Sequence, residues 1–253
     1  MSMGALLLIK RAILQLIRNP SAPVSGLGMS LFFLIVYNEG IGGIGFLPEF
    51  GQAGYLAFLF PLTIASLAMG SSSAAASSLQ RDLQSGYFRR IYLSPLRRYA
   101  FVLAPLVADG VGTLSMTSVL VLVGALMGIP FQMGFLSVLG ILLLSFLWGT
   151  TISALAAGVM IRSKNHQGGQ MVTMLVFPLL FFSTTFTPKE LIGSEWFLRI
   201  AQFNPVTYLF EGSRFLLAGT ASAEYFYLAC LILVISASAA TGFALMGSKR
   251  ILA

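Results

Sequence analysis

The chain has 253 residues, of which 57% are hydrophobic and only 9% are charged. A soluble domain carries about 25% charged residues, so this composition excludes a soluble enzyme with an ordinary surface. A helix needs about 20 mostly apolar residues to cross a bilayer, so the length allows about five to seven spans and little else. One cysteine, Cys230, excludes an internal disulfide framework and a cysteine-rich metal site. The composition predicts an integral membrane protein.

Six long apolar runs, bounded by charged residues, Gly or Pro, predict six membrane-spanning helices. They lack the short alternation of outer-membrane strands, so we expect an all-α polytopic protein. No cleavable signal peptide is evident, because the first run ends in Tyr37-Asn38-Glu39 and not at small residues. The predicted spans cover about residues 21–37, 53–77, 100–127, 135–161, 169–186 and 225–247.

The net charge of +7 indicates topology and not an affinity for nucleic acid. If six helices alternate in direction, twelve of the fifteen Lys and Arg residues lie on one side of the membrane. The other side holds Lys189, Arg199 and Arg214 with all six glutamates. An odd number of spans would distribute the basic residues over both sides of the membrane. The positive-inside rule therefore places both termini and the 78–99 loop in the cytoplasm. We expect a multi-pass protein of the plasma (inner) membrane.

Residues 3–18 precede the first span and form the first predicted element. Lys10, Arg11 and Arg18 fall on one side of a helical wheel, and Leu, Ile and Ala fill the rest. This pattern is typical of an amphipathic interfacial helix that contacts membrane lipid on the cytoplasmic surface. Asn19-Pro20 would end it. The alternative is a cytosolic extension of the first span.

The cytoplasmic stretch 77–99, between the second and third spans, is longer than a turn. Its apolar residues alternate with basic ones, which predicts a short helix that Ser94-Pro95 ends. The alternative is a solvated loop that serves topology alone. Such a loop, however, needs neither exposed Phe and Tyr nor this length.

Two features inside the spans are candidates for a substrate path. Asp109 lies about ten residues, roughly 15 Å, into the third span, and a carboxylate at that depth is a functional candidate. It could equally be structural, hydrogen-bonded by a Ser or Thr of a neighbouring helix. Phe177, Phe181 and Phe182 in the fifth span could line an apolar path or face lipid.

The external segment 184–224 is too apolar for a free loop and too charged for a full span. Each central charge costs about 2.5–3.5 kcal/mol on insertion scales, which disfavours the alternative of two further spans. We therefore expect external half-helices over residues 187–219 that enter the membrane partway.

Catalytic motifs are missing from the sequence. There is no GxxxxGK[ST] phosphate loop, no HExxH and no GxSxG, and the one histidine is His166. We expect no catalytic residues, no metal and no cofactor in this chain.

Two motifs resemble those of a known family, the membrane permease subunit of ABC-2 type exporters. The cytoplasmic motif of that family is an acid, three residues, Gly-Thr, then Leu-x-Pro and basic residues. Here Asp82, Gly86-Tyr87 and Leu93-Ser94-Pro95 match it, with Asp for Glu and Tyr for Thr. The second motif, NPxTYxxExxR before the last span, matches Asn204 to Arg214.

The resemblance implies a single ABC-2 type transmembrane domain over residues 1–253 and a separate cytoplasmic ABC ATPase dimer that binds ATP and Mg. It also implies a second permease copy or a sister permease. Residues 79–93 would form a coupling helix on the ATPase, with the N-terminal helix as a second contact. The implied ATPase-coupling residues are Asp82, Gly86, Tyr87, Arg89, Arg90, Leu93 and Pro95, the N-terminal interface is Lys10, Arg11 and Arg18, and the external gate is Asn204, Pro205, Tyr208, Glu211 and Arg214.

The expected function is export of an amphipathic substrate (a drug, lipid or glycolipid) by alternating access, driven by the ATPase subunit. The spans offer aromatic residues and almost no charge to hold an ion. The alternatives are a gradient-driven secondary transporter that uses Asp109 and a membrane assembly protein that transports nothing.

Overall fold

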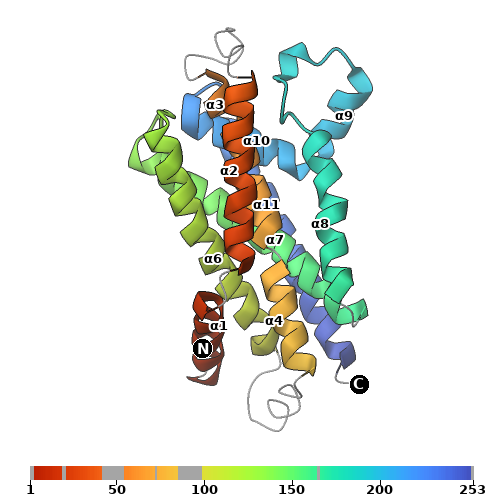
Figure 1. The fold of residues 1–253 in the computed structure, drawn as a ribbon. Coiled ribbons are helices and arrows are strands. Elements are labelled where there is room, and N and C mark those ends of the chain that lie inside the picture. The colour runs from red at the N-terminus through yellow and green to blue at the C-terminus, as the bar shows by residue number, and fades with distance from the viewer. Residues whose placement is uncertain are drawn as a thin grey trace.

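The computed structural model describes residues 3–18, 21–41, 54–71, 73–84, 99–163 and 166–251. Its described elements are all helices, which confirms the predicted all-helical class for this part of the chain. Figure 1 shows an elongated bundle with α1, α4 and the C-terminus at one end and α9 and α10 at the other. The helices are α1 Met3–Arg18, α2 Ser21–Ile41, α3 Gly54–Ser71, α4 Ser73–Gln84, α6 Tyr99–Leu126, α7 Phe135–Ser163, α8 His166–Phe181, the 3-10 helix η3 Lys189–Leu191, α9 Glu195–Phe203, α10 Pro205–Ala218 and α11 Ala223–Ile251.

Four helices of the described part are long and apolar enough to cross a membrane. The apolar helices Val24–Gly40 in α2 and Gln167–Phe181 in α8 are shorter, and they coincide with the first and fifth predicted spans. The structure thus supports four candidate spans, and the count of six stays a prediction. The four are Gly54–Asp82 (α3 with α4), Tyr99–Leu126, Phe135–Ser163 and Ala223–Gly247.

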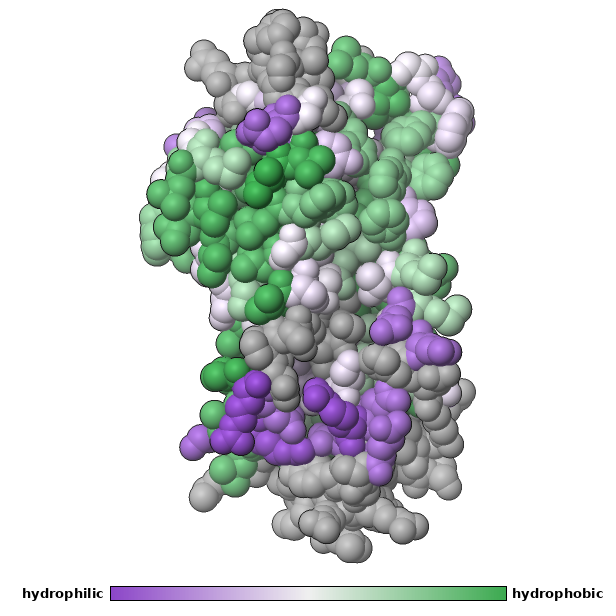
Figure 2. Space-filling model, in the orientation of Figure 1, coloured by the Kyte–Doolittle hydropathy of each residue, from purple (hydrophilic) through white to green (hydrophobic). Residues whose placement is uncertain are grey.

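The hydropathy of the surface changes along the length of the bundle. On the face in Figure 2, hydrophobic residues cover the half of the molecule that holds α2 and the upper part of α6. Hydrophilic residues gather near the end that holds α1 and α4. This polarity is the one expected if the α1–α4 end meets an aqueous phase.

Helix α7 lies at the centre of the bundle and packs against α11, α6, α8, α4, α3 and α10. Small residues permit these close contacts, as in other membrane helices. A Cβ on Gly158 would lie 2.5 Å from the ring of Phe243 on α11, and one on Gly149 would lie 2.9 Å from Thr113 on α6. Larger side chains at these glycines would force the helices apart.

The N-terminal helix α1 packs along the first half of α6. Leu8 and Ala12 are buried, and a Cβ on Gly112 would lie 2.8 Å from the side chain of Leu16. Leu7 and Ile17, in contrast, are 61% and 68% exposed. The predicted amphipathic helix therefore uses part of its apolar surface for the protein and leaves the rest open.

After α8 the chain turns and forms η3, α9 and α10. Pro205 is the first residue of α10, and Gly219 ends that helix in the left-handed conformation, with φ of 64°. Helix α10 packs against α11, α3 and α7, whereas α9 contacts α10 weakly. Ala201 is the one buried residue of α9, a helix that is described throughout. The segment predicted as half-helices thus has one firmly packed helix and one loosely held helix.

Candidate functional sites

The first site joins α1 to α4 near the end of the bundle that carries both helices. Arg11 donates two hydrogen bonds to the carboxylate of Asp82, from Nη2 to Oδ1 at 2.7 Å and from Nη1 to Oδ2 at 3.1 Å. This is the two-pronged geometry that suits a guanidinium and a carboxylate. Asp82 is 6% exposed, so the pair is shielded from solvent on the α4 side.

A second contact lies one turn away from this ion pair. The hydroxyl of Ser78 on α4 donates a hydrogen bond to Oε1 of Gln15 on α1, at 3.4 Å. Lys10 and Arg18 are exposed on α1, and Arg81 is exposed on α4. The two helices are therefore tied together, and basic side chains remain open at the surface.

The sequence assigned Asp82 to the coupling motif and Arg11 to a separate N-terminal interface. The structure brings these two predicted residues into direct contact. Helix α4 ends at Gln84, so the predicted helix 79–93 is described only over residues 79–84. The other predicted coupling residues lie outside the described residues: Gly86, Tyr87, Arg89, Arg90, Leu93 and Pro95.

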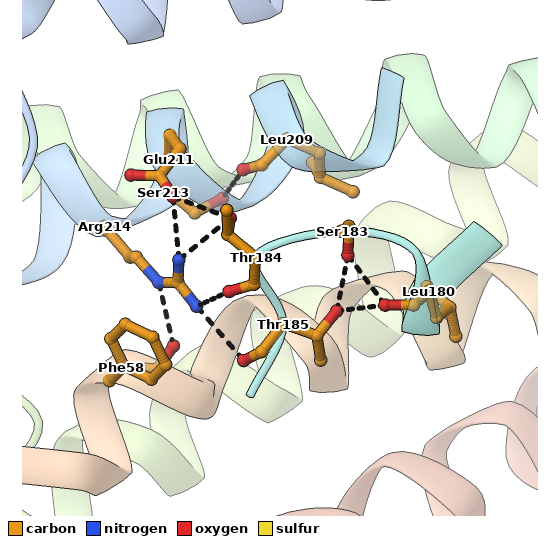
Figure 3. Close-up of polar contacts among 9 residues, drawn as sticks. All are labelled: Phe58, Leu180, Ser183, Thr184, Thr185, Leu209, Glu211, Ser213 and Arg214. Carbon is orange, nitrogen blue, oxygen red and sulfur yellow. Dashed lines mark hydrogen bonds and ion pairs between the residues drawn. The ribbon is translucent and has the colours of Figure 1, made fainter. Parts of the chain in front are cut away.

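The second site is the buried ion pair of Glu211 and Arg214 on α10 (Figure 3). Arg214 is 3% exposed and Glu211 is 8% exposed. Nη1 of Arg214 donates to Oε1 of Glu211 at 2.9 Å. The guanidinium also lies over the ring of Phe58 on α3, 3.5 Å from its centroid.

Backbone carbonyls from two other segments complete the set of partners. Nε of Arg214 donates to the carbonyl of Phe58 at 3.2 Å, and Nη2 donates to the carbonyls of Thr184 at 2.6 Å and Thr185 at 3.1 Å. Nη1 also donates to the hydroxyl of Thr184 at 3.2 Å, and that hydroxyl donates to Glu211 at 2.7 Å. Each of the five guanidinium N–H groups thus has an acceptor. The pair fixes α10 to α3 and to the turn after α8.

Asn204, in the same motif, connects α10 to the end of α8. Its Nδ2 donates to the carbonyls of Leu179 at 2.6 Å and Phe182 at 2.8 Å, which belong to the end of α8 and the turn after it. Its Oδ1 accepts from the backbone N–H of Val206 at 3.0 Å and so caps α10. Tyr208 donates from its hydroxyl to the carbonyl of Gln202 at 2.9 Å and ties α10 to α9.

Together the motif residues connect α10 to α3 and to the end of α8, and Tyr208 adds one hydrogen bond to α9. The predicted role of the motif as an external gate stays a prediction. The sequence missed Phe58, Thr184 and Thr185, because their contribution is mostly through backbone carbonyls, which no residue pattern reveals.

Asn204→Asp is expected to destabilise the protein by about 1–3 kcal/mol, because it places a carboxylate against two carbonyl oxygens and removes both donated hydrogen bonds. The cap on Val206 would survive, since it uses an oxygen. Thermal unfolding in detergent measures the change. Gln202→Glu, on the exposed side of α9, is the matched amide-to-acid control. An equal midpoint for both variants would contradict the role of Asn204.

Asp109 is buried in α6 at 2% exposure, and the hydroxyl of Ser153 on α7 donates a hydrogen bond to it. This is the structural partner that the sequence left open as an alternative. Asp109 also borders a cavity of about 30 Å³, which Gln15, Ser78 and Arg81 line as well. Within the described residues no group of three His, Cys, Asp or Glu side chains could hold a metal ion.

The phenylalanines of the predicted path lie at the other end of α8 from this cavity. Phe177 and Phe181 stack edge to face with centroids 5.2 Å apart, and Phe181 contacts Phe186 at 5.5 Å. Phe182 instead contacts Phe197 of α9, at 6.1 Å. The structure therefore does not bring Asp109 together with the phenylalanines.

Comparison with known proteins identifies the family. The model of the ABC-2 type transporter family matches residues 4–218. The daunorubicin resistance ABC transporter permease protein DrrB1 of Streptomyces coeruleorubidus is 28% identical over 218 residues, which cover 85% of this chain and 74% of that protein.

Two other relatives are similar over a comparable length. The putative transport permease ycf38 of Cyanophora paradoxa is 28% identical over 213 residues, 83% of this chain and 72% of that protein. The probable doxorubicin resistance ABC transporter permease protein DrrC of Mycobacterium tuberculosis is 22% identical over 209 residues, 83% of this chain and 75% of that protein. The chain belongs to the ABC-2 type transporter family.

Proposed function

We propose that this chain is the membrane-spanning subunit of an ATP-driven exporter. ABC-2 permeases work with a cytoplasmic ABC ATPase, generally as a dimer. In our proposal the ATPase subunits bind ATP and Mg, and this chain supplies the path. A second copy of the chain or a sister permease completes that path, and a twofold homodimer is the commoner arrangement.

The contact of Arg11 with Asp82 is the observation that carries this proposal. Asp82 lies near the end of α4, directly before the segment 85–98 that contains the rest of the coupling motif. A force that the ATPase exerts on that segment would be transmitted to α4. Because Arg11 is bound to Asp82 and α1 packs on α6, the same force would reach α1 and α6.

At the other end of the bundle, the contacts of Arg214 would transmit this movement to the external gate, which would open. These contacts tie α10 to α3, and α3 is followed in the chain by α4. Alternating access then consists of a rocking of the two permease subunits, with α9 and α10 as the external gate. The termini and the 78–99 segment would lie on the cytoplasmic side of the inner membrane.

The substrate class in this proposal is amphipathic: a drug, lipid or glycolipid. The names of two relatives connect those proteins with daunorubicin and doxorubicin resistance. In this chain the candidate path offers Phe177, Phe181 and Phe182, each of them 39–47% exposed. Asp109, a buried acid on α6, already accepts a hydrogen bond from Ser153.

Reversing both arginines of the coupling segment, Arg89→Glu with Arg90→Glu, is expected to abolish association with the ATPase while the permease still folds. The reason is the loss of two cationic contacts and the addition of like charge to the interface. Co-purification of the ATPase from membranes measures this loss. Arg199→Glu, a single charge reversal on exposed α9, should retain the ATPase. Retention by the double variant would refute the placement of the coupling segment.

A further inference from the structure

A hollow of about 330 Å³ lies between the end of α8, the segment that follows it, and α9. Four aromatic residues line it, together with Leu191 and Ile192. In Figure 1 α9 lies beside the upper end of α8, far from the end that holds α1 and α4. The four aromatic residues are Phe181, Phe186, Trp196 and Phe197.

The rings form two pairs, one from α8 and the segment after it and the other from α9. Phe181 of α8 lies 5.5 Å from Phe186, with their planes at 33°. Trp196 and Phe197 of α9 lie 5.9 Å apart, with their planes at 74°. Phe181 is 47% exposed and Trp196 is 61% exposed, so ring surface remains open on both sides. Aromatic rings gain most from partners that stack offset or edge to face, which a flat ring system can do.

The polar lining of the hollow consists of hydroxyls. Ser183 already donates to the carbonyl of Leu180 and contacts the hydroxyl of Thr185. Thr187 and Ser194 also line the hollow. None of the described side chains that line it is charged. A charged group inside it would lose hydration without gaining a counterion from these side chains.

We propose that this hollow binds a planar, uncharged aromatic ring system, and that it is the external site from which the exported substrate leaves the permease. Its volume is at the small end of ligand pockets, which run from about 300 to 1,000 Å³. It therefore suits a fused ring system and leaves any flexible or charged part of the substrate outside. The release role rests on the proposed function, whereas the binding does not.

Trp196 provides a direct probe. The chain has two tryptophans, and the other, Trp148, is 2% exposed within α7. In the variant Trp148→Phe, reconstituted in lipid vesicles without ATPase, pyrenemethanol should quench the emission of Trp196 by energy transfer. We expect a saturable component of this quenching, above the linear background that comes from pyrenemethanol dissolved in the lipid. If Trp148→Phe fails to fold, the difference between the native chain and Trp196→Phe gives the same signal.

Gly193 allows the hollow to be narrowed without a clash. It lines the hollow, and a Cβ built on it meets no atom within 4 Å. Gly193→Leu is expected to weaken the saturable binding about tenfold through the loss of ring contacts. Gly28→Leu on α2, where a Cβ likewise meets no atom within 4 Å, is the matched control and should bind normally.

Three results would overturn the proposal. The first is quenching that never saturates. The second is saturable binding that Gly193→Leu leaves unchanged. The third is equal competition by cyclododecanol, a saturated alcohol, which would mark a general apolar space for lipid tails. Since no ATPase is present, any of these results leaves the exporter proposal standing, and loss of ATPase association would leave this binding site standing.

Discussion

Replacing Arg214 by glutamine is expected to lower the free energy of unfolding by about 3–5 kcal/mol, because it leaves Glu211 as a buried, unpaired charge. It also removes the guanidinium donors from the carbonyls of Phe58, Thr184 and Thr185. We expect little folded protein in the membrane. Fluorescence-detected size exclusion after heating in detergent measures both the yield and the unfolding midpoint.

Two further variants show whether the loss of stability comes from the burial of this ion pair or from the loss of a positive charge alone. Arg199→Gln breaks an ion pair with Glu195 whose side chains are 79% and 90% exposed, so its effect should stay within about 1 kcal/mol. Arg214→Lys keeps the charge but cannot reach all five acceptors, so it should fall between the two. If Arg214→Gln and Arg199→Gln unfold at the same temperature, the buried contacts of Arg214 do not stabilise the external helices.

Reversing either charge of the Arg11–Asp82 pair is expected to reduce substrate-stimulated ATP hydrolysis by the transporter at least tenfold while the protein still folds. Asp82→Arg would oppose two guanidinium groups, and Arg11→Asp would oppose two carboxylates, so α1 would separate from α4. The exchanged double variant, Arg11→Asp with Asp82→Arg, restores opposite charges and should recover a large part of the activity. Substrate-stimulated ATP hydrolysis by the reconstituted complex measures all three.

A neighbouring residue provides the control for this pair. Lys10 lies beside Arg11 in the chain but is exposed, so Asp82→Arg should not restore the activity that Lys10→Asp loses. Equal recovery of Lys10→Asp and Arg11→Asp by Asp82→Arg would indicate that the net charge of α1 matters and the specific contact does not. A double variant as inactive as the single ones would contradict coupling through this pair.

The helical architecture was predictable because long apolar runs have few other solutions in a bilayer. The structure supports four full-length candidates and two shorter helices at the remaining predicted positions. Helix α8 ends earlier than the hydropathy pattern predicts. It ends at Phe181, and the predicted continuation to residue 186 is a turn held by Ser183 and Thr185.

The sites were predictable where partners are close in sequence. Glu211 and Arg214 stand three residues apart on a helix and so face each other. Arg11 and Asp82 are 71 residues apart, and only the packing of α1 on the bundle brings them together. The aromatic hollow was missed for the same reason. Its rings come from α8, a turn and α9, and the sequence indicated only Phe181 among them.

The most direct test of the exporter account is purification of the native protein in mild detergent, with mass spectrometry of the proteins that accompany it. The account predicts a stoichiometric cytoplasmic ABC ATPase, and either a second copy of this chain or one sister permease. Absence of any ATPase, under conditions that preserve other ABC complexes, would contradict it. Transport that survives ATP depletion but collapses with the proton gradient would then point to Asp109.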